Sequence, residues 1–314
     1  MSRSVYLGVD GGGTKTRFAL VDAADRLLAE CQLGTTYHPQ VGMDGVRHIL
    51  GDGIAQVLAL AEATPADIGM AFFGLPAFGE DSQATLALEQ IPGEVLGHTR
   101  YACDNDMVCG WAGSLACADG INIIAGTGSM GYGRRGDASA RAGGWGEAFS
   151  DEGSAYWIAV QGLNAFSRMS DGRLPRGPLY DILRAHFQLG AHDLDLCAHV
   201  YGEGKGTRGD LAQLSPQVSR AAEAGDAVAA GIFVRAAQEL AAIAEALRVT
   251  LGFAAGETVP LSWSGGAFSA GAVLMAPFEA ALMAASPDFA LRTPQHAPHY
   301  GAAMLARRMG LTGG

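Results

Sequence analysis

Three consecutive glycines follow an aspartate near the start of the chain and precede a lysine that lies between two threonines. The segment consists of Asp10, Gly11, Gly12, Gly13, Thr14, Lys15 and Thr16. A turn built from glycines exposes several backbone N–H groups to an anion, and a neighbouring carboxylate suits Mg²⁺ or its bound waters. The segment therefore predicts a phosphate-binding loop with Asp10 beside a metal ion. A tight turn with an acidic neighbour is the structural alternative.

This loop differs from the two commonest glycine-rich phosphate loops. The apolar runs on either side, 6–9 and 17–22, are both typical of strands, so the loop joins two strands of a hairpin. A dinucleotide-binding fingerprint must open a helix. A Walker A loop has a lysine where Thr14 stands here, after Gly8 and Gly13. Both motifs are therefore excluded.

Two aspartates and an asparagine follow a predicted strand at 100–103 and come just before a helix expected over 107–118. Ligands bind at the carboxyl ends of strands in open α/β sheets. Asp104, Asn105 and Asp106 therefore stand where a general base or a metal-associated carboxylate would be placed. Aspartate is also a preferred helix cap, and capping is the alternative role.

A second strand–glycine loop–strand unit begins at Asp119. The apolar run 121–125 leads into Gly126, Thr127, Gly128 and Ser129, and a glycine-alternating segment continues to a turn at 136–137. This repeat of the opening pattern indicates an internal duplication. We expect two similar domains, each offering a glycine hairpin to the same cleft.

The segment 143–154 combines four glycines, two aromatic residues and three carboxylates. Aromatic faces stack on sugar rings and carboxylates accept hydrogen bonds from hydroxyl groups, so Trp145 and Asp151 are candidate sugar ligands. The alternative is a glycine-rich loop packed by Trp145.

A strand at 259–264 ends in Gly265 and Gly266, before a helix expected from residue 271. A step from strand through two glycines to helix lets a flat group lie against the backbone, which is consistent with an adenosine pocket. The pair of glycines could instead serve close packing alone.

The order of predicted elements alternates between strands and helices, which indicates an α/β architecture. Helices are expected over 45–63, 81–90 (ending before Pro92), 154–168, 226–252 and 299–309. We expect two domains, 1–117 and 118–314, and helix 299–309 is a candidate to pack back on the first domain.

Composition limits the classes of function. The 314 residues carry a formal net charge of −11, which argues against a nucleic-acid backbone or an anionic membrane as the main partner. No signal peptide is expected, and the apolar segment 270–285 is too short to span a bilayer. The five cysteines form no Cys-x2-Cys pair, so we expect reduced thiols in the cytoplasm.

Taken together, these motifs resemble those of the superfamily of sugar kinases, heat-shock-cognate chaperones and actin. Within it, the chain looks most like the BadF/BadG-type ATPases and N-acetylglucosamine kinases. The resemblance covers nearly the whole chain. Its motifs are Asp10–Thr16, Asn105-Asp106, Gly126–Ser129, Gly143–Gly146 with Asp151–Trp157, and Gly265-Gly266.

The resemblance implies two ribonuclease H-like domains of the actin-like ATPase fold with a cleft between them. It also implies ATP-dependent phosphorylation of N-acetyl-D-glucosamine at its 6-hydroxyl, with Asp106 as the catalytic base and Asp10 near Mg²⁺. Asp106 is preferred to Asp104 only because of the family pattern. The ATP ligands implied are Gly11, Gly12, Gly13, Thr14, Lys15, Thr127, Gly265 and Gly266. The sugar ligands implied are Asn105, Gly128, Ser129, Trp145 and Asp151.

The loop 36–39 departs from the pattern of some N-acetylglucosamine kinases, which carry an asparagine and a tryptophan there. Glucosamine is therefore an alternative substrate. A different alternative for the function is that of another BadF-type ATPase, one that acts with a non-sugar partner. A sugar-responsive repressor would need an N-terminal helix-turn-helix, and we expect none because the predicted first strand begins only a few residues into the sequence. The dehydratase-activating ATPases of this family use cysteines to hold an iron–sulfur cluster, and no suitable pair is evident. The sequence leaves open whether the protein forms a homodimer.

Overall fold

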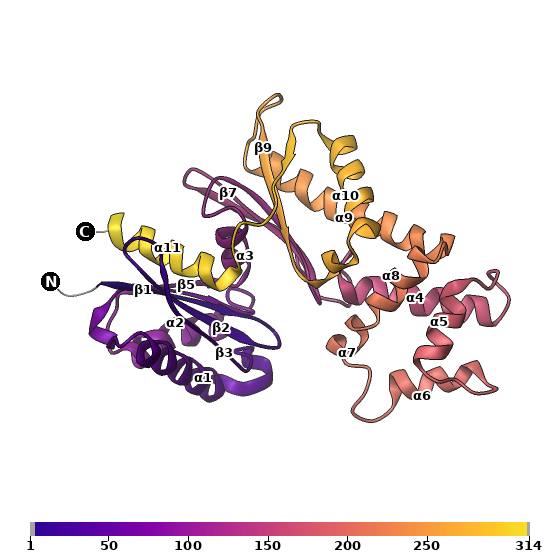
Figure 1. Cartoon of the computed structure of the whole chain (residues 1–314), viewed down its shortest axis with the longest axis horizontal. Coiled ribbons are helices and arrows are strands. Elements are labelled where there is room, and N and C mark those ends of the chain that lie inside the picture. Colours follow the sequence, from indigo (N-terminus) through magenta and orange to yellow (C-terminus); the bar gives the residue numbers. More distant parts are fainter. Residues whose placement is uncertain (1–3, 313–314) are drawn as a thin grey trace. The chain divides into compact units, whose positions relative to one another are not determined.

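The computed structural model describes residues 4–312, and the chain divides into two compact units (Figure 1). The first unit runs to Asp119 and also includes the segment from Thr293 onward. The second unit is Gly120–Arg292. Each unit contains a mixed sheet of five strands with helices packed on it, as an α/β architecture requires.

The sheet of the first unit has the strand order β3-β2-β1-β4-β5. Its strands are β1 (Val5–Gly11), β2 (Thr16–Asp22), β3 (Leu27–Leu33), β4 (Ile68–Leu75) and β5 (Tyr101–Asn105). Strands β1, β2 and β3 are antiparallel neighbours, whereas β1, β4 and β5 are parallel. Strand β1 is buried on both faces, which explains its almost unbroken apolar run.

Helices cover both faces of this sheet (Figure 1). Helices α1 (His38–Leu60) and α2 (Ser82–Leu96) lie on one face, while α3 (Met107–Ser114) and α11 (Pro298–Thr312) lie on the other. A short 3₁₀ helix, Pro65–Asp67, precedes β4. The backbone of α11 approaches β1 so closely that a Cβ at Gly8 would lie 2.1 Å from the Ala303 nitrogen. The final helix thus belongs to the first unit.

The sheet of the second unit has the order β10-β9-β6-β7-β8. Its strands are β6 (Gly120–Ala125), β7 (Ser129–Arg135), β8 (Ala138–Gly143), β9 (Val259–Ser264) and β10 (Phe289–Leu291). Three strands are antiparallel and three are parallel, with β6 in both sets, as β1 is in the first unit. The predicted repetition of a strand–glycine loop–strand unit is therefore confirmed at the level of the fold.

The helices of the second unit form most of its core. They are α4 (Ala155–Ser170), α5 (Pro178–His186), α6 (Leu196–Tyr201), α7 (Arg208–Ala212), α8 (Ser215–Glu223), α9 (Ala227–Thr250) and α10 (Ala272–Ala285), with 3₁₀ helices at Asp193–Asp195 and Gly266–Ala270. Among the described residues, α9 alone is long and apolar enough to cross a membrane. Its buried residues belong to the hydrophobic core of this unit, which accounts for its apolar character.

Several element boundaries differ from those expected. Helix α2 continues through Pro92 to Leu96, because Leu88, Ile91 and Pro92 are all buried and this packing outweighs the missing N–H of the proline. Helix α3 ends at Ser114, four residues earlier than expected. Helices α6, α7 and α8 were not predicted, since they are short and polar.

Candidate active site

The first glycine loop connects β1 to β2 in the first unit. The Gly12 N–H donates to the Lys15 carbonyl oxygen at 2.8 Å, which closes a tight turn. Gly13, Thr14 and Lys15 are exposed, and a Cβ at Gly13 would meet nothing within 4 Å. The loop therefore presents an open stretch of backbone, as a phosphate-binding hairpin requires.

Thr35 and Thr36, in the segment that follows β3, support this loop. The Thr35 hydroxyl donates to the Gly12 carbonyl oxygen at 2.7 Å, and the Thr16 hydroxyl donates to that of Thr36 at 3.1 Å. A Cβ at Gly11 would lie 2.3 Å from the Thr36 Oγ1 atom, so Gly11 is required for this contact. Sequence reasoning took 34–39 only as a polar loop and missed the support that Thr35 and Thr36 give to the glycine turn.

Asp10 lies where three parallel strands end together. In the sheet register Asp10 of β1 is opposite Gly74 of β4, and Gly74 is opposite Asp104 of β5. Asp106 follows directly after β5. A Cβ at Gly74 would lie 3.1 Å from the Asp106 Cα atom, so the absence of a side chain on β4 lets Asp106 approach the sheet.

Asp10 and Asp106 influence each other electrostatically. Burial, and after it the negative charges of Asp10 and Glu80, raise the pKa of Asp106 to about 7. The backbone N–H groups of Met107 and Asp106 oppose this rise. Burial also raises the pKa of Asp10 to about 7, while Arg17 and then Lys15 oppose that shift. These carboxylates are thus poised near neutral pH.

Asp106 occupies the N-cap position of α3, yet its carboxylate makes no capping hydrogen bond. The neighbouring Asn105 takes over this function, because its Oδ1 accepts from the Met107 N–H at 3.2 Å. The Asn105 amide also donates to the Phe78 carbonyl at 3.1 Å, and the Asp104 carboxylate accepts from the Asn105 N–H at 2.7 Å. The contact at the start of α3 is therefore made by Asn105, and no capping hydrogen bond is recorded for the Asp106 carboxylate.

Glu80 was missed by sequence reasoning. It is exposed and follows β4, the strand between β1 and β5. The signal that could have identified it is its position, because the residues after neighbouring parallel strands gather at one edge of a sheet.

The second glycine loop connects β6 to β7 in the second unit. The Gly126 N–H donates to the Gly128 carbonyl at 2.8 Å, and the Gly126 carbonyl accepts from the Ala155 N–H at 2.9 Å. Thr127 at the tip is exposed. Gly265 adopts a φ of +104°, and a Cβ there would lie 2.4 Å from the Ala125 carbonyl oxygen. Gly265 thus allows the end of β9 to approach this loop, whereas Gly266 faces open space.

Asp151 lies beside the second glycine loop and is only 2% exposed. Its Oδ1 accepts from the Ser129 N–H at 3.4 Å, and its Oδ2 accepts from the Arg208 guanidinium. Burial raises the pKa of Asp151, and the positive charge of Arg208 opposes that rise. Sequence reasoning did not find Arg208, which lies 57 residues away in a segment without a recognisable motif.

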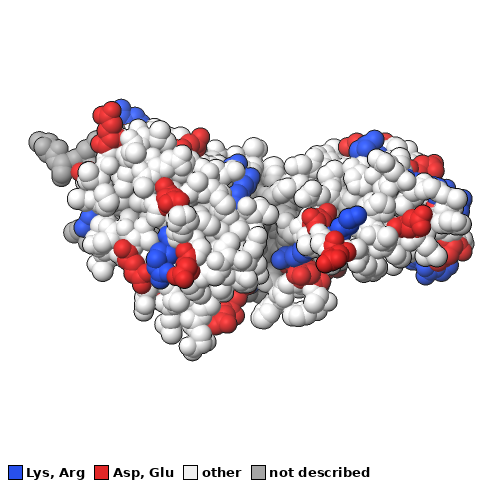
Figure 2. All heavy atoms as spheres, turned by 90° about the horizontal axis from the view of Figure 1, so that it is seen from below, with Lys and Arg blue, Asp and Glu red and all other residues white. Residues whose placement is uncertain are grey.

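Trp145 and Phe149 project from the loop between β8 and α4. They are 73% and 75% exposed, so Trp145 does not pack this loop, contrary to the structural alternative. On the molecular face in Figure 2, the basic side chains among the described residues are scattered between acidic ones. That face offers no continuous basic patch for a nucleic acid.

The structure thus groups the predicted site residues by unit. Asp10, the first glycine loop, Asn105 and Asp106 lie together in the first unit. Gly128, Ser129 and Asp151 lie together in the second, with Gly265 against the start of the same loop. Among the described residues, no contact of the Trp145 side chain with the others is recorded, and Gly266 adjoins Gly265 but faces open space.

The residues around Asp10 suit a magnesium ion bound with a nucleotide. Among residues 4–312, no group of three or more His, Cys, Asp or Glu side chains is placed to hold a metal ion alone. Nucleotide-bound Mg²⁺ needs only one or two carboxylates, since phosphates and waters complete its coordination. Two coupled, largely buried carboxylates would both be stabilised in their ionised forms by such a cation.

Two mixed five-stranded sheets of the same topology, each with a glycine hairpin between its first strands, define the actin-like ATPase fold. The crystal structure of a proposed N-acetylglucosamine kinase from Chromobacterium violaceum has this fold. It aligns with a TM-score of 0.77 and 23% identity over 98% of this chain and 100% of that one. The chain belongs to the BadF/BadG/BcrA/BcrD ATPase family, which it matches over residues 7–306.

Three curated relatives are similar along most of their length. N-acetyl-D-glucosamine kinase of Dictyostelium discoideum is 29% identical over 98% of both chains. N-acetylmuramic acid/N-acetylglucosamine kinase of Clostridium acetobutylicum is 30% identical over 74% of this chain and 76% of its own. Glucosamine kinase GspK of Vibrio cholerae is 28% identical over 75% of this chain and 77% of its own.

Proposed function

We propose that this protein transfers the γ-phosphoryl group of ATP to the 6-hydroxyl of N-acetyl-D-glucosamine, with Asp106 as the general base. Membership of an ATPase family supports ATP as the donor, and the names of the three relatives support an amino sugar as the acceptor. The observation that carries the proposal is the Asp10–Asp106 pair at the carboxyl ends of β1 and β5, the two strands that flank β4.

The environment of Asp106 suits proton abstraction. A general base works best when its pKa lies near the working pH, and the pKa of Asp106 is about 7. Its carboxylate makes no capping hydrogen bond to α3. In the proposed reaction it accepts the proton of the 6-hydroxyl as that oxygen attacks the γ-phosphorus.

The first glycine loop and Asp10 would hold the phosphates. Gly12 closes the turn through its bond to the Lys15 carbonyl, so the exposed Gly13 backbone and Thr14 side chain would supply donors to phosphate oxygens, and Lys15 would add a positive charge. Mg²⁺, associated with Asp10, would neutralise charge on the phosphate oxygens. Phosphoryl transfer depends on such positioning and charge neutralisation more than on covalent chemistry.

Residues of the second unit are also assigned to the two substrates, on the family pattern. Thr127 is assigned to the phosphates and Gly265 with Gly266 to the adenosine. Gly128, Ser129, Trp145 and Asp151 are assigned to the sugar, together with Asn105 of the first unit. Support for this assignment comes from the exposed Thr127, the exposed indole face of Trp145 and the packing of Gly265 against Ala125. A cytoplasmic location, near the ATP pool, fits this role.

Glucosamine is the second candidate acceptor, because the loop that follows β3 offers little to an acetyl group. Thr36 lies in the loop where some N-acetylglucosamine kinases carry an asparagine and a tryptophan, but its side chain is completely buried. Its hydroxyl accepts from Thr16 and lies against Gly11, so it cannot reach a sugar.

A coupled assay of ADP release tests both candidates. The purified protein is supplied with ATP, Mg²⁺ and, in turn, N-acetylglucosamine, glucosamine, N-acetylmannosamine and glucose. We expect the highest kcat/KM with N-acetylglucosamine. A preference for glucosamine would favour the second candidate, and no stimulation by any sugar would contradict a sugar kinase while leaving the fold unaffected.

A further inference from the structure

Arg208 links a short, separate helix to the loops of the proposed sugar site. It is the first residue of α7, which packs on α4. Thr207 caps this helix, since its hydroxyl accepts from the Asp210 N–H and its own N–H donates to the Asp210 carboxylate. The start of α7, and with it the Arg208 side chain, is therefore held in place by its own sequence.

The guanidinium group of Arg208 contacts two carboxylates of one loop. It forms an ion pair with Asp151, which is 2% exposed, and its Nε lies 3.4 Å from the Oε2 of Glu147. The Arg208 side chain itself is 38% exposed. Removing one partner of a buried ion pair leaves the other charge uncompensated, so the Asp151 carboxylate depends on Arg208.

The Arg208–Asp151 ion pair lies directly against the second glycine loop. A Cβ at Gly128 would be 2.2 Å from Nη2 of Arg208 and 2.8 Å from Oδ2 of Asp151. The other oxygen of Asp151 accepts from the Ser129 N–H at 3.4 Å. The ion pair thus fixes the backbone of two residues that the proposed function places beside the sugar.

Asp151 also adopts an unusual backbone conformation. Its φ is +62°, which is disfavoured for a residue with a side chain. A strained residue keeps its conformation only when its surroundings hold it there. Here the surroundings are the guanidinium on one carboxylate oxygen and the Ser129 N–H on the other.

We propose that Arg208 is a positioning residue for the sugar site. It keeps the buried Asp151 carboxylate ionised and in one orientation, and thereby holds Gly128 and Ser129 in the conformation that receives the sugar. This inference rests on the proposed function. It assigns to α7 a role in sugar affinity and none in the chemistry of phosphoryl transfer.

Steady-state kinetics of Arg208→Ala tests this role. We expect the KM for the amino sugar to rise about ten- to a hundredfold, the range for loss of a hydrogen bond to a charged group. The KM for ATP should change by less than about threefold, because the first glycine loop is untouched. An unchanged sugar KM would overturn the inference. A lower sugar KM would also overturn it, since Arg208 would then be obstructing the site.

The pH dependence separates positioning from a general structural effect. Without the positive charge of Arg208, Asp151 binds a proton more readily, so the sugar KM of Arg208→Ala should fall as the pH is raised from 6 to 9. A sugar KM that stays raised by the same factor at every pH, relative to wild type, would show a structural role only. Arg208→Lys should remove this pH dependence, because it restores the charge.

Arg208→Lys also carries the test if Arg208→Ala does not fold. An ammonium group lacks the planar fork of a guanidinium, so we expect a sugar KM about three- to tenfold above wild type. A KM equal to that of the wild type would contradict orientation by Arg208.

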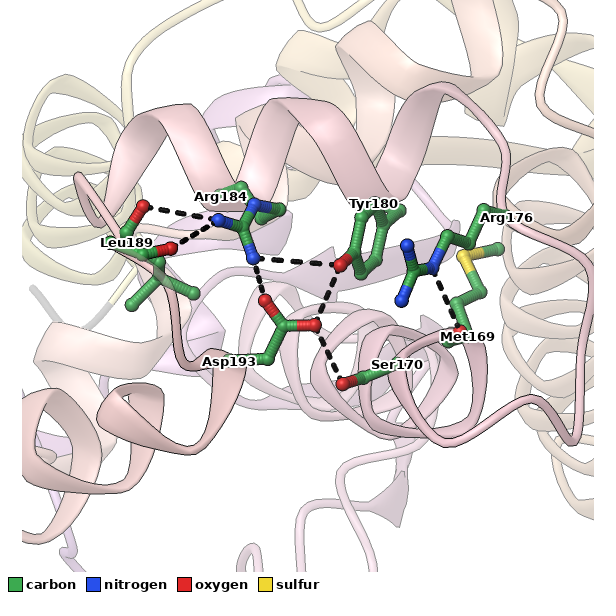
Figure 3. Close-up of polar contacts among 8 residues, drawn as sticks. Met169, Ser170, Arg176, Tyr180, Arg184, Leu189 and Asp193 are labelled. Atoms are coloured by element: carbon green, nitrogen blue, oxygen red, sulfur yellow. Dashed lines mark hydrogen bonds and ion pairs between the residues drawn. The ribbon is translucent and has the colours of Figure 1, made fainter.

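Arg184→Ala is a matched control in the same unit. Arg184 of α5 also forms an ion pair with a half-buried aspartate, Asp193, and its hydrogen bonds go to Tyr180, Leu189 and Gly190 (Figure 3). Asp193 further accepts from Ser170 and Tyr180, so this network anchors the segment after α5. Arg184→Ala should lower thermal stability and leave the sugar KM within about twofold of wild type.

The outcomes distinguish this inference from the proposed function. If the wild-type protein phosphorylates none of the sugars, the proposed function fails, and the inference fails with it. If the wild type is active and Arg208→Ala and Arg184→Ala have the same sugar KM, the inference alone fails.

Discussion

The negative charge of Asp10 raises the pKa of Asp106, although the two residues are far apart in the sequence. Parallel pairing of β1, β4 and β5 brings the ends of these strands to one edge of the sheet. Two acidic groups so placed favour a cation, and they also favour proton acceptance near neutral pH. The same pair therefore supports both roles that a phosphoryl-transfer site requires.

Asp106→Asn should abolish sugar phosphorylation. An amide cannot accept the hydroxyl proton, and loss of a general base typically lowers turnover about 10²–10⁴-fold. ATP binding, measured by calorimetry, should persist because the first glycine loop is unchanged. Asp104→Asn is the matched control and should keep turnover within about tenfold of wild type. The assignment of the base would be wrong if Asp106→Asn were nearly as active as the wild type or if Asp104→Asn were the inactive variant.

The acidic limb of the kcat/KM profile should report the ionisation of Asp106 in the free enzyme. Activity requires the ionised carboxylate, so kcat/KM should fall as the pH drops below about 7. Because Asp10 and Asp106 interact, the observed pKa values belong to the pair.

Glu80→Gln should shift this acidic limb. The negative charge of Glu80 raises the pKa of Asp106, so its removal should lower that pKa and move the limb to lower pH by a few tenths of a unit. Glu89→Gln serves as control, since Glu89 acts on Tyr101 and Cys103 instead. A shift of the limb to higher pH in Glu80→Gln would contradict the electrostatic argument.

Asp106→Asn should also stabilise the fold at alkaline pH. The folded pKa of about 7 lies above the ordinary aspartate value of 3.8, so the wild-type carboxylate lowers stability progressively as the pH rises from 4 to above 7. With allowance for the partial exposure of the side chain, the penalty is about 1–2 kcal/mol. Each kcal/mol corresponds to about 2–4 °C in melting temperature for domains of 150–250 residues.

Thermal unfolding at pH 8 and pH 4.5 checks the sign of this effect. The melting temperature of Asp106→Asn should exceed that of the wild type at pH 8, and the difference should shrink at pH 4.5, where the wild-type residue is protonated. A destabilised variant at pH 8 would show that the Asp106 carboxylate supports the fold.

The overall fold could be predicted because its signal is local and repeated. A strand–glycine loop–strand pattern can be recognised from a few adjacent residues, and its second copy at Gly126 indicates duplication. Asp106 could be found for the same reason, since it directly follows a strand. The course of α2 through Pro92 could not, because burial of Leu88 and Ile91 outweighs the local effect of proline.

Contacts between distant segments could not be predicted. Arg208 meets Asp151 only because α7 packs on α4, and nothing near Arg208 in the sequence indicates an acidic partner. The support that Thr35 gives to Gly12 likewise depends on the path of the chain after β3. In both places a short polar segment without a recognisable motif, at Arg208 or at Thr35, holds a predicted motif in position.

Gly13→Ala and Gly8→Ala should separate two roles of glycine in β1 and its loop, namely access of phosphates to the backbone at Gly13 and close packing of α11 at Gly8. A Cβ at Gly13 meets nothing within 4 Å and the residue does not adopt a left-handed φ, so the melting temperature should change little. If ATP phosphates lie against this backbone, the KM for ATP should rise about tenfold or more, because the methyl group occupies their place. An unchanged KM would exclude Gly13 from the phosphate site.

Gly8→Ala should have the opposite effect. Its Cβ would lie 2.1 Å from the Ala303 nitrogen and 2.5 Å from the His299 carbonyl oxygen, so β1 and α11 would have to separate. Overpacking of this kind costs about 1–3 kcal/mol or more. We expect a clear loss of melting temperature, and an ATP KM close to wild type at temperatures where the variant is folded. A stable Gly8→Ala variant would contradict the close packing of α11 on β1.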